Sequence, residues 1–349
     1  MLKDDFKKLT KNNKKRLSNK KIKIENSNIF FKDSLSEVTS IIKVSNATLF
    51  FDKKKSLNLF NLKGEVFNIP FTLDYNYAPN SNKSKRMEIV ASDLRLKIID
   101  ENLNIGENLT RGINNISILN STINTKYDIV NQIIILESSN SKMHNSRISY
   151  NGRLAINPFD LDLKINLDNY KVSNLFKSNS IINEIIKSQL LFNKNISIKT
   201  SANIRSKKID EIFHQAEIKL NIVNGRINFD NSIFISDNIG LLEITNSDLF
   251  IKNGKLTLIA SLSIDIKDTD RLFSFLNTSK KSRKDIKNVK ISIIYDFLSN
   301  QIEFKNVKVD DNELSDKFLN LIGDFSDNNA NNLMKSRRLL NELIQLYEG

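Results

Sequence analysis

The chain has 349 residues, of which 40% are hydrophobic, and it carries a formal net charge of +13. This length and apolar content allow one large domain or two to three ordinary domains with a real core. Nine glycines, three prolines and no cysteine exclude collagen-like and low-complexity chains, disulfide frameworks and thiolate metal sites.

Residues 1–22 are predicted to form a basic, flexible segment without the apolar stretch of a signal peptide. Residues 1–23 contain ten Lys or Arg and two Asp, so most of the net charge lies there. Elsewhere acidic and basic residues mix along every predicted strand, a pattern that is typical of a solvated face and predicts no nucleic-acid partner. For the segment itself, contact with anionic lipid and a nucleic-acid arm remain alternatives.

Residues 23–325 are predicted to form one elongated β domain made of repeated multi-strand units, roughly 23–150 and 151–311. Apolar residues recur at every second position in most of this region, which is typical of strands with one buried and one solvated face. In the first unit the alternation is seen at Leu94, Leu96 and Ile98. The expected fold class is mainly β: a long antiparallel meander curled into an open groove, or half-pipe, with one apolar concave face.

A short motif occurs twice, as GEVFNIPFTLD from Gly64 and as GRLAINPFDLD from Gly152. In both copies a proline lies six residues after the glycine, and a phenylalanine follows it. Because proline cannot donate to a β-ladder, it marks an edge, a bulge or a bend, and we expect it to let a long strand curve. The motif residues are Gly64, Pro70, Phe71, Gly152, Pro158 and Phe159.

Three segments show helical spacing of their apolar residues: 179–191, 269–277 and an amphipathic C-terminal helix over 326–349. Such apolar stripes usually pack against the rest of the protein rather than against a membrane. We expect these helices, short and at strand ends, to be too few to cover the whole apolar face of the sheet.

Two Asn-Gly pairs, at 224–225 and 253–254, lie between alternating stretches and predict β-hairpins with type I′ turns. In each hairpin the register places apolar residues opposite one another, on a single face of the sheet. The predicted pairs are Ile222 with Ile227, Leu220 with Phe229, Ile251 with Leu256, and Leu249 with Leu258.

The stretch LTLIASLSIDI (256–266) is about twice as long as an ordinary strand. Another hairpin is predicted from alternation over 289–297, a turn at 298–300 and a second strand that begins around Ile302. A sheet with so long an apolar face must close on itself as a sandwich or curl around something apolar. We predict that the face lines an apolar groove, which the family resemblance given below assigns to lipid. The predicted lining residues are Ile218, Leu220, Ile222, Ile227, Phe229, Leu249, Ile251, Leu256, Leu258, Leu262, Ile264, Ile291 and Ile293.

No pattern in the sequence predicts catalysis, a metal site or a cofactor. The two histidines, His144 and His214, lack the spacing of a metal-binding motif, and there is no nucleophile elbow, phosphate-binding loop or dinucleotide fingerprint. Two acidic groups remain, and both are interpreted as solvated residues rather than paired catalytic carboxylates. They are Asp160 with Asp162, and Asp310 with Asp311 and Glu313.

The paired motif, together with segments 151–176, 246–266 and 289–311, resembles the C-terminal part of AsmA-like proteins of bacterial envelopes, over roughly residues 22–349. This resemblance implies a non-enzymatic, repeating-β-groove or bridge-like lipid transport protein. Its apolar groove would bind or conduct phospholipid between inner and outer membranes, or contribute to outer-membrane assembly.

The same resemblance implies the partners and the location. The partners would be phospholipid or another acyl-chain lipid, and envelope proteins at the groove ends. The location would be periplasmic, with tethering to the inner membrane in full-length members. The chain shows neither the N-terminal membrane helix nor the upstream β repeats of that family, so we expect it to be a C-terminal portion.

Three alternatives to lipid handling remain open. A structural β-sandwich or scaffold of the envelope would have a closed core and a protein partner. An outer-membrane protein with spanning strands would show similar alternation, but the absence of tryptophan and of a signal sequence counts against it. An enzyme is the weakest alternative and would require an unexpected polar pocket.

Overall fold

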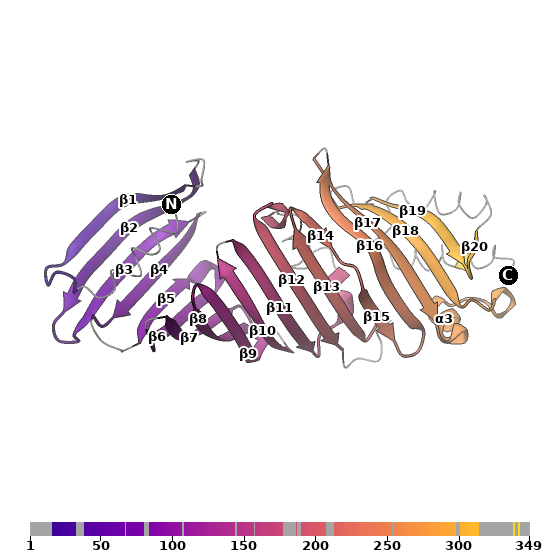
Figure 1. Ribbon diagram of the computed structural model, residues 1–349, viewed down its shortest axis with the longest axis horizontal. Helices are drawn as coiled ribbons and strands as arrows, with labels where there is room; N and C mark the ends of the chain where they lie inside the picture. The colour runs from indigo at the N-terminus through magenta and orange to yellow at the C-terminus, as the bar shows by residue number, and fades with distance from the viewer. Residues whose placement is uncertain are drawn as a thin grey trace. The chain divides into compact units, whose positions relative to one another are not determined.

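A computed structural model of the chain describes residues 16–32, 38–66, 68–79, 84–106, 108–143, 145–156, 158–176, 186, 190–206, 213–252, 254–297, 301–313, 338 and 341–342. The chain divides into two compact units, Met1–Asn151 (unit 1) and Gly152–Gly349 (unit 2). Each is mainly β, with long strands that follow one another as a mostly antiparallel meander (Figure 1). The predicted fold class, a mainly β and mostly antiparallel meander, is confirmed.

In unit 1, each strand from the first to the eighth pairs antiparallel with the next strand in sequence. A 3-10 turn, η2 (Ser92–Leu94), precedes the sixth strand, so Leu94 is not part of the strand predicted there. The strands are β1 (Ile22–Lys32), β2 (Val38–Asp52), β3 (Leu57–Val66), β4 (Ile69–Tyr77), β5 (Lys85–Ala91), β6 (Leu96–Asn104), β7 (Leu109–Ile118), β8 (Ser121–Val130), β9 (Ile133–Met143) and β10 (Ser146–Ile156), which ends in unit 2.

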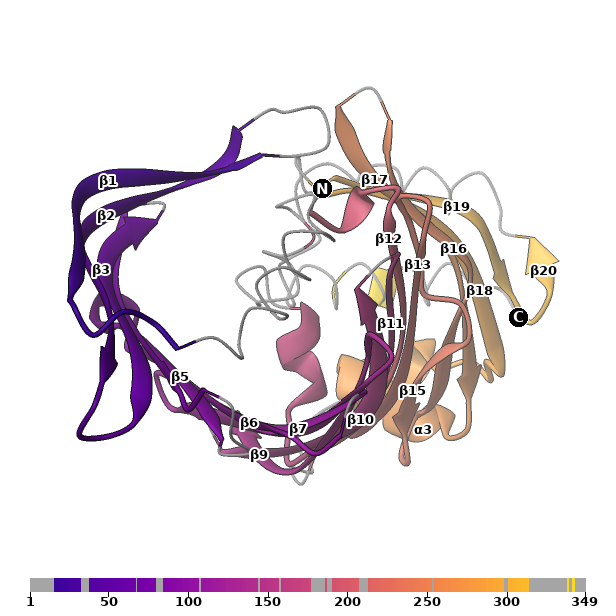
Figure 2. The same ribbon diagram turned by 60° about the vertical axis from the view of Figure 1, so that its left-hand side comes forward.

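The sheet of unit 1 is curved, as the path from β1 to β9 shows in Figure 2. Side chains converge and shield one another on the concave side of a curved sheet, whereas those on the convex side diverge. In β4 the apolar residues are half-buried while their polar neighbours are exposed, as at Leu73 and Asp74. The lower exposure of the apolar side chains identifies their side as the concave one.

Unit 2 contains one parallel strand pair, which corrects the expectation of an antiparallel meander throughout. The pair is β11 (Phe159–Asp168) with β12 (Ile196–Arg205), and Phe159 lies opposite Ile196. A parallel pair needs a crossover of a dozen or more residues. Residues 169–195 supply it, and they contain the 3-10 turns η3 (Val172–Phe176) and η4 (Leu190–Phe192).

The other strands of unit 2 form antiparallel pairs. They are β13 (Gln215–Val223), β14 (Arg226–Asn228), β15 (Ser232–Ser236), β16 (Gly240–Lys252), β17 (Lys255–Ile266), β18 (Asn288–Asp296), β19 (Gln301–Val309) and β20 (Asn312–Glu313). The helix predicted over 269–277 is confirmed as α3 (Thr269–Leu276), which η5 (Lys280–Ser282) follows. Its N-cap is Asp268, whose carboxylate accepts from the backbone N–H of Arg271 at 3.0 Å.

The other two predicted helices, 179–191 and 326–349, lie almost entirely outside the described residues. In the first, Ile186 is helical and buried, and Leu190 opens η4. In the second, Arg338 forms an i,i+4 ion pair with Glu342 at 2.8 Å. Of the predicted basic segment, residues 1–15 lie outside the described residues, and β1 begins at Ile22.

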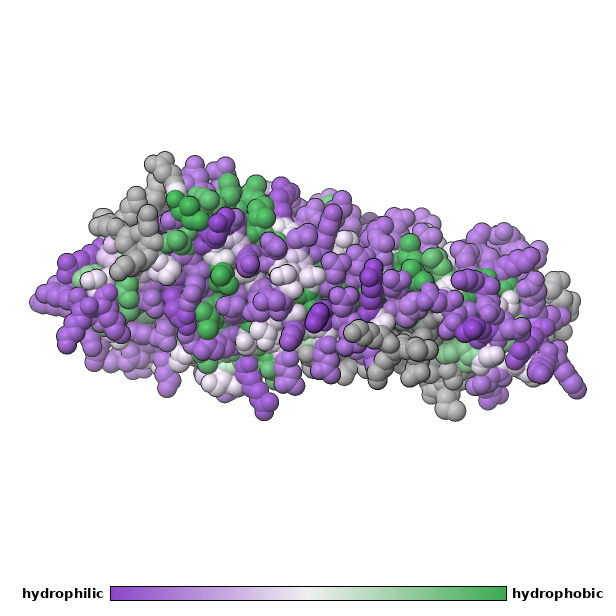
Figure 3. Space-filling view, turned by 90° about the horizontal axis from the view of Figure 1, so that it is seen from below, coloured by the Kyte–Doolittle hydropathy of each residue, from purple (hydrophilic) through white to green (hydrophobic). Residues whose placement is uncertain are grey.

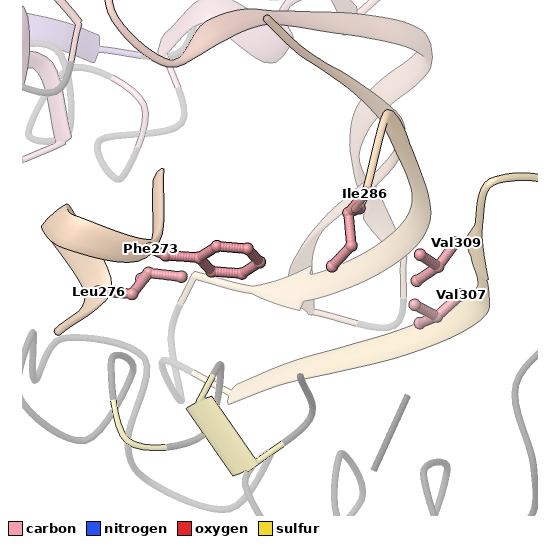
Figure 4. Packing of buried hydrophobic residues seen from close by; sticks show 5 residues of the cluster. All are labelled: Phe273, Leu276, Ile286, Val307 and Val309. Carbon is pink, nitrogen blue, oxygen red and sulfur yellow. The ribbon is translucent and has the colours of Figure 1, made fainter. Parts of the chain in front are cut away.

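Three buried clusters cover much of the apolar face of unit 2. In the first, shown in Figure 4, Phe273 and Leu276 of α3 point toward Ile286, Val307 and Val309. In the second cluster, Leu191 and Phe192 of η4 pack with Ile186 over β13, β14, β16 and β17. The third cluster places Val172 and Leu175 of η3 over β12, β13 and β15. Short helical segments therefore cover much of this face in unit 2, whereas no described helix covers the apolar face of unit 1.

The two predicted hairpins of unit 2 are present in the predicted register. Ile222 pairs with Ile227, Ile251 with Leu256, and Leu249 with Leu258. The predicted pair of Leu220 with Phe229 is wrong, because β14 ends at Asn228 and the N–H of Phe229 donates to Ser247 Oγ at 2.6 Å.

Asparagine supplies much of the left-handed backbone of the described residues. Of 15 non-glycine residues with positive φ, nine are asparagines, including Asn224 of the first hairpin turn. Asn246 and Asn306 lie where the strand registers shift, the place where a bulge most often has glycine. The short polar side chain of asparagine tolerates this conformation better than a β-branched one.

Both copies of the repeated motif lie across a strand, a turn and the following strand. Gly64 is in β3 and opposes Phe71 of β4, while Gly152 is in β10 and Phe159 opens β11. Pro70 is the second residue of β4, and Pro158 is in the turn before β11.

The glycine of the first copy has little room for a side chain. A Cβ at Gly64 would lie 2.6 Å from the carbonyl oxygen of Lys43 on β2. We therefore expect Gly64→Ala to lower the free energy of unfolding by about 1–3 kcal/mol, as overpacking usually does. Urea denaturation measures the change. Gly106→Ala is the control, because a Cβ there meets no described atom within 4 Å; equal effects would contradict the prediction.

Candidate functional site

An uncovered apolar surface lies on the concave side of unit 1. Eight side chains, one from each of β1 to β8, oppose one another in register and form a continuous line across the strands. We call this line the apolar row; it consists of Ile24, Ala47, Leu62, Leu73, Ile89, Ile98, Ile116 and Ile123. With strands about 4.8 Å apart, it extends over about 34 Å.

Burial along the apolar row is uneven. Ala47 and Leu62 are buried and pack with Val44, Phe60 and Phe71. From Leu73 to Ile123 the row is only half-buried, and Ile24 is exposed. In the part of unit 1 that the structure describes, the one helical element is η2, which lies mainly against β4 and β6. No described helix therefore covers the row.

Exposed apolar residues are concentrated in unit 1. Of sixteen large apolar side chains that are exposed among the described residues, twelve belong to this unit. Green side chains appear at the surface of the left-hand part of Figure 3, where its strands lie. These side chains lie on both sides of the sheet and in its turns, and among them only Ile24 belongs to the apolar row. Unit 1 therefore has more exposed apolar surface than unit 2 in the part that the structure describes.

The convex side of the same sheet carries charged pairs beside exposed apolar residues such as Ile113 and Ile135. Cross-strand ion pairs follow the strands: Lys43 with Glu65, Arg86 with Glu101, Lys97 with Glu88, and Arg111 with Asp128. The ammonium of Lys97, followed by the guanidinium of Arg86, lowers the pKa of Glu88, and Arg111 lowers the pKa of Asp128. These exposed pairs each contribute little to stability but keep this side solvated.

A polar lane accompanies the apolar row on the concave side. We define it as Tyr75, Lys85, Asp100, Asn102, Asn114 and Tyr127, which the strand register places on the same face as the row. Asp100 is its centre. The hydroxyl of Tyr127 donates to both carboxylate oxygens of Asp100, at 2.9 and 3.0 Å, and Asn102 Nδ2 donates at 2.8 Å.

Partial burial affects the titrating groups of the polar lane. Burial, with smaller contributions from Tyr77 and Asp100, raises the pKa of Tyr75 to about 12. Burial and Asp100 also raise the pKa of Tyr127, so both phenols are neutral donors at neutral pH. Loss of hydration lowers the pKa of Lys85.

The predicted lining residues all lie in unit 2, and the structure places most of them beneath its helical segments. Ile222, Ile227, Leu249 and Leu256 have no exposed surface. Leu220, Phe229 and Leu258 pack against them, Ile218 joins the third cluster and Ile291 the first. Ile293 is buried, Leu262 and Ile264 are half-buried, and Ile251 is exposed.

The structure also places most of the candidates for catalysis. His214 Nε2 lies 3.0 Å from Asp237, while His144 is outside the described residues. Asp160 pairs with Arg153, and Asp311 with Lys290. Asp310 accepts from the backbone N–H groups of Lys287 and Asn288. Among the described residues no three His, Cys, Asp or Glu side chains gather as metal ligands.

The sequence analysis missed the apolar row and the polar lane. Alternation in β6 to β8 is interrupted by asparagine, serine and threonine, so these strands look weaker than those of unit 2. The row emerges only when the register of every hairpin is known, because its members are far apart in sequence. A search for apolar residues in register across successive turns would have found it.

The geometry defines a mainly β meander protein in which helical segments cover much of the apolar face of one unit, while no described helix covers that of the other. No protein-family profile, no curated protein and no solved structure matches the chain. No helix in the described part is both long and apolar enough to span a membrane.

Proposed function

We propose that the chain is a non-enzymatic lipid-binding protein whose apolar row holds the acyl chains of a phospholipid. The observation that carries the proposal is the unbroken register of apolar side chains from Ile24 to Ile123, without a described helix over them. A row of about 34 Å is comparable with the hydrocarbon core of a bilayer, about 30 Å thick.

The energetics favour an acyl chain as the ligand. Removing one methylene from water is worth about 0.8 kcal/mol, so ten methylenes half-covered by the row contribute on the order of 4 kcal/mol. No bond is made or broken, and a row that continues from strand to strand lets a chain move along it without leaving apolar surface. Conduction of phospholipid between the two membranes of an envelope, from a periplasmic location, is the wider role that we propose with it.

A structural role for unit 2 is a second candidate, and a specific observation favours it. Its three clusters leave Ile222, Leu249 and Phe273 almost without exposed surface. A face that its own helical segments cover has little surface for lipid. Unit 2 would then act as a scaffold that supports a lipid-binding unit 1 or binds an envelope protein.

Native mass spectrometry of the chain, purified without detergent, tests the proposed function. We expect phospholipid to remain bound to a folded chain, and extraction of the same sample identifies it. A folded monomer that carries no lipid, even after incubation with dioleoylphosphatidylglycerol, would contradict the proposal and favour the scaffold role.

A further inference from the structure

The polar lane lies beside the apolar row at a distance that suits one lipid molecule. Asp100 and Asn114 are two residues along their strands from Ile98 and Ile116, and Asn102 is four residues away. At about 3.4 Å per residue, the polar groups begin about 7 Å from the row and extend to about 14 Å. The apolar row and the polar lane therefore run side by side on the concave side.

Asp100 already has its hydrogen-bond partners within the sheet. Besides Tyr127 and Asn102, Asn114 Nδ2 donates to it at 3.3 Å. The ring of Tyr127 packs over Gly112, where a Cβ would collide with it, so the hydroxyl is held in place. These neutral donors occupy the carboxylate oxygens, so Asp100 has its hydrogen bonds without Lys85.

Lys85 is the cation of the polar lane. It opens β5 and lies opposite Asn102, on the concave side. Its side chain is half-buried, and none of the carboxylates that the structure describes lies within 4 Å of its ammonium. A partly desolvated cation without an anion is unfavourable, and a bound anion would offset the lost hydration.

We propose that the polar lane orients the lipid by its headgroup, with the phosphate at Lys85 and the acyl chains on the apolar row. This inference rests on the proposed function and adds to it the residue that binds the phosphate and the orientation of the lipid on the sheet. The lowered pKa of Lys85 agrees with it, since the ammonium lacks a compensating charge in the free protein.

The test compares two lipids with identical chains, dioleoylphosphatidylglycerol and dioleoylglycerol, in binding to the full chain. The unaltered chain is expected to prefer the phosphate-bearing lipid. Lys85→Met should reduce that preference about tenfold, the effect of losing one hydrogen bond to a charged group. It should not weaken the binding of dioleoylglycerol. Lys85→Arg should restore it. Lys63→Met, an exposed lysine of β3 opposite Thr72 on the convex side, is the matched control.

Each other outcome has a separate meaning. If Lys85→Met keeps the full preference, the headgroup inference fails while lipid binding stands. If neither lipid binds the unaltered chain, the proposed function itself fails. If millimolar inorganic phosphate displaces dioleoylphosphatidylglycerol, Lys85 binds free phosphate and the assignment to a lipid headgroup is wrong.

Discussion

Replacing Ile98 and Ile116 together by aspartate is expected to remove bound phospholipid from the chain. The two side chains oppose each other in the middle of the apolar row and are only half-buried. An acyl chain crossing them would have to desolvate two carboxylates, at several kcal/mol each, so we expect more than about hundredfold weaker binding. Native mass spectrometry with lipid extraction measures the loss.

Ile99→Asp with Ile113→Asp is the matched control for this experiment. The same strands, β6 and β7, carry these residues, but on the convex side. We expect this variant to retain its lipid, and circular dichroism should show that both double variants keep their β structure. Unchanged lipid in the Ile98 and Ile116 variant, or equal loss in the control, would remove the apolar row from the binding surface.

The second large effect is expected in the stability of unit 2. Leu249 has no exposed surface and belongs to the second buried cluster. Leu249→Ala should lower the free energy of unfolding by about 2–5 kcal/mol, because it removes buried methyl groups and leaves a cavity. Hydrogen exchange of the β16 and β17 amides reports this change locally.

The same strand offers the control for the stability prediction. Ile251 is 37% exposed, so Ile251→Ala should cost less than about 1 kcal/mol. Lipid binding by unit 1 should be unaltered in both variants if the apolar row is the binding surface. If Leu249→Ala loses its lipid without faster hydrogen exchange in β16, the residues of unit 2 that were predicted to line the groove would instead be the candidates for lipid binding.

Local chemistry made much of the fold predictable. Asn224-Gly225 determines a turn with positive φ at both residues, and the register of Ile222 with Ile227 follows from it. The same argument predicted the pairing around Gly254, and helical spacing predicted α3. These features depend on residues close together in the sequence.

What could not be predicted depends on residues far apart. The parallel pairing of β11 with β12 is decided by where a crossover of many residues packs, and alternation is the same in parallel and antiparallel strands. That crossover carries η3 and η4 over the apolar face of unit 2. A sequence pattern shows that a face is apolar, but not whether another segment covers it.

The candidate site shows that strong apolar alternation does not identify the face that stays uncovered. The strongest alternation, in β16 and β17, predicted a groove, yet Leu249 and Leu256 are fully buried. The weaker strands of unit 1, in which Asn114 and Thr125 interrupt the apolar residues, have the uncovered row. Strands that are covered tolerate continuous apolar residues, whereas strands that stay in contact with water need polar residues among them.

The asparagines in left-handed conformation limit which substitutions this sequence tolerates. A chain with nine glycines still forms its bulges and turns, since residues such as Asn246 and Asn277 adopt the required backbone. Isoleucine, although frequent in the chain, would add roughly 1–2 kcal/mol of strain at such a position. Substitution toward isoleucine is therefore tolerated along the strands but opposed at these asparagines, whose backbone conformation forms the bulges and turns.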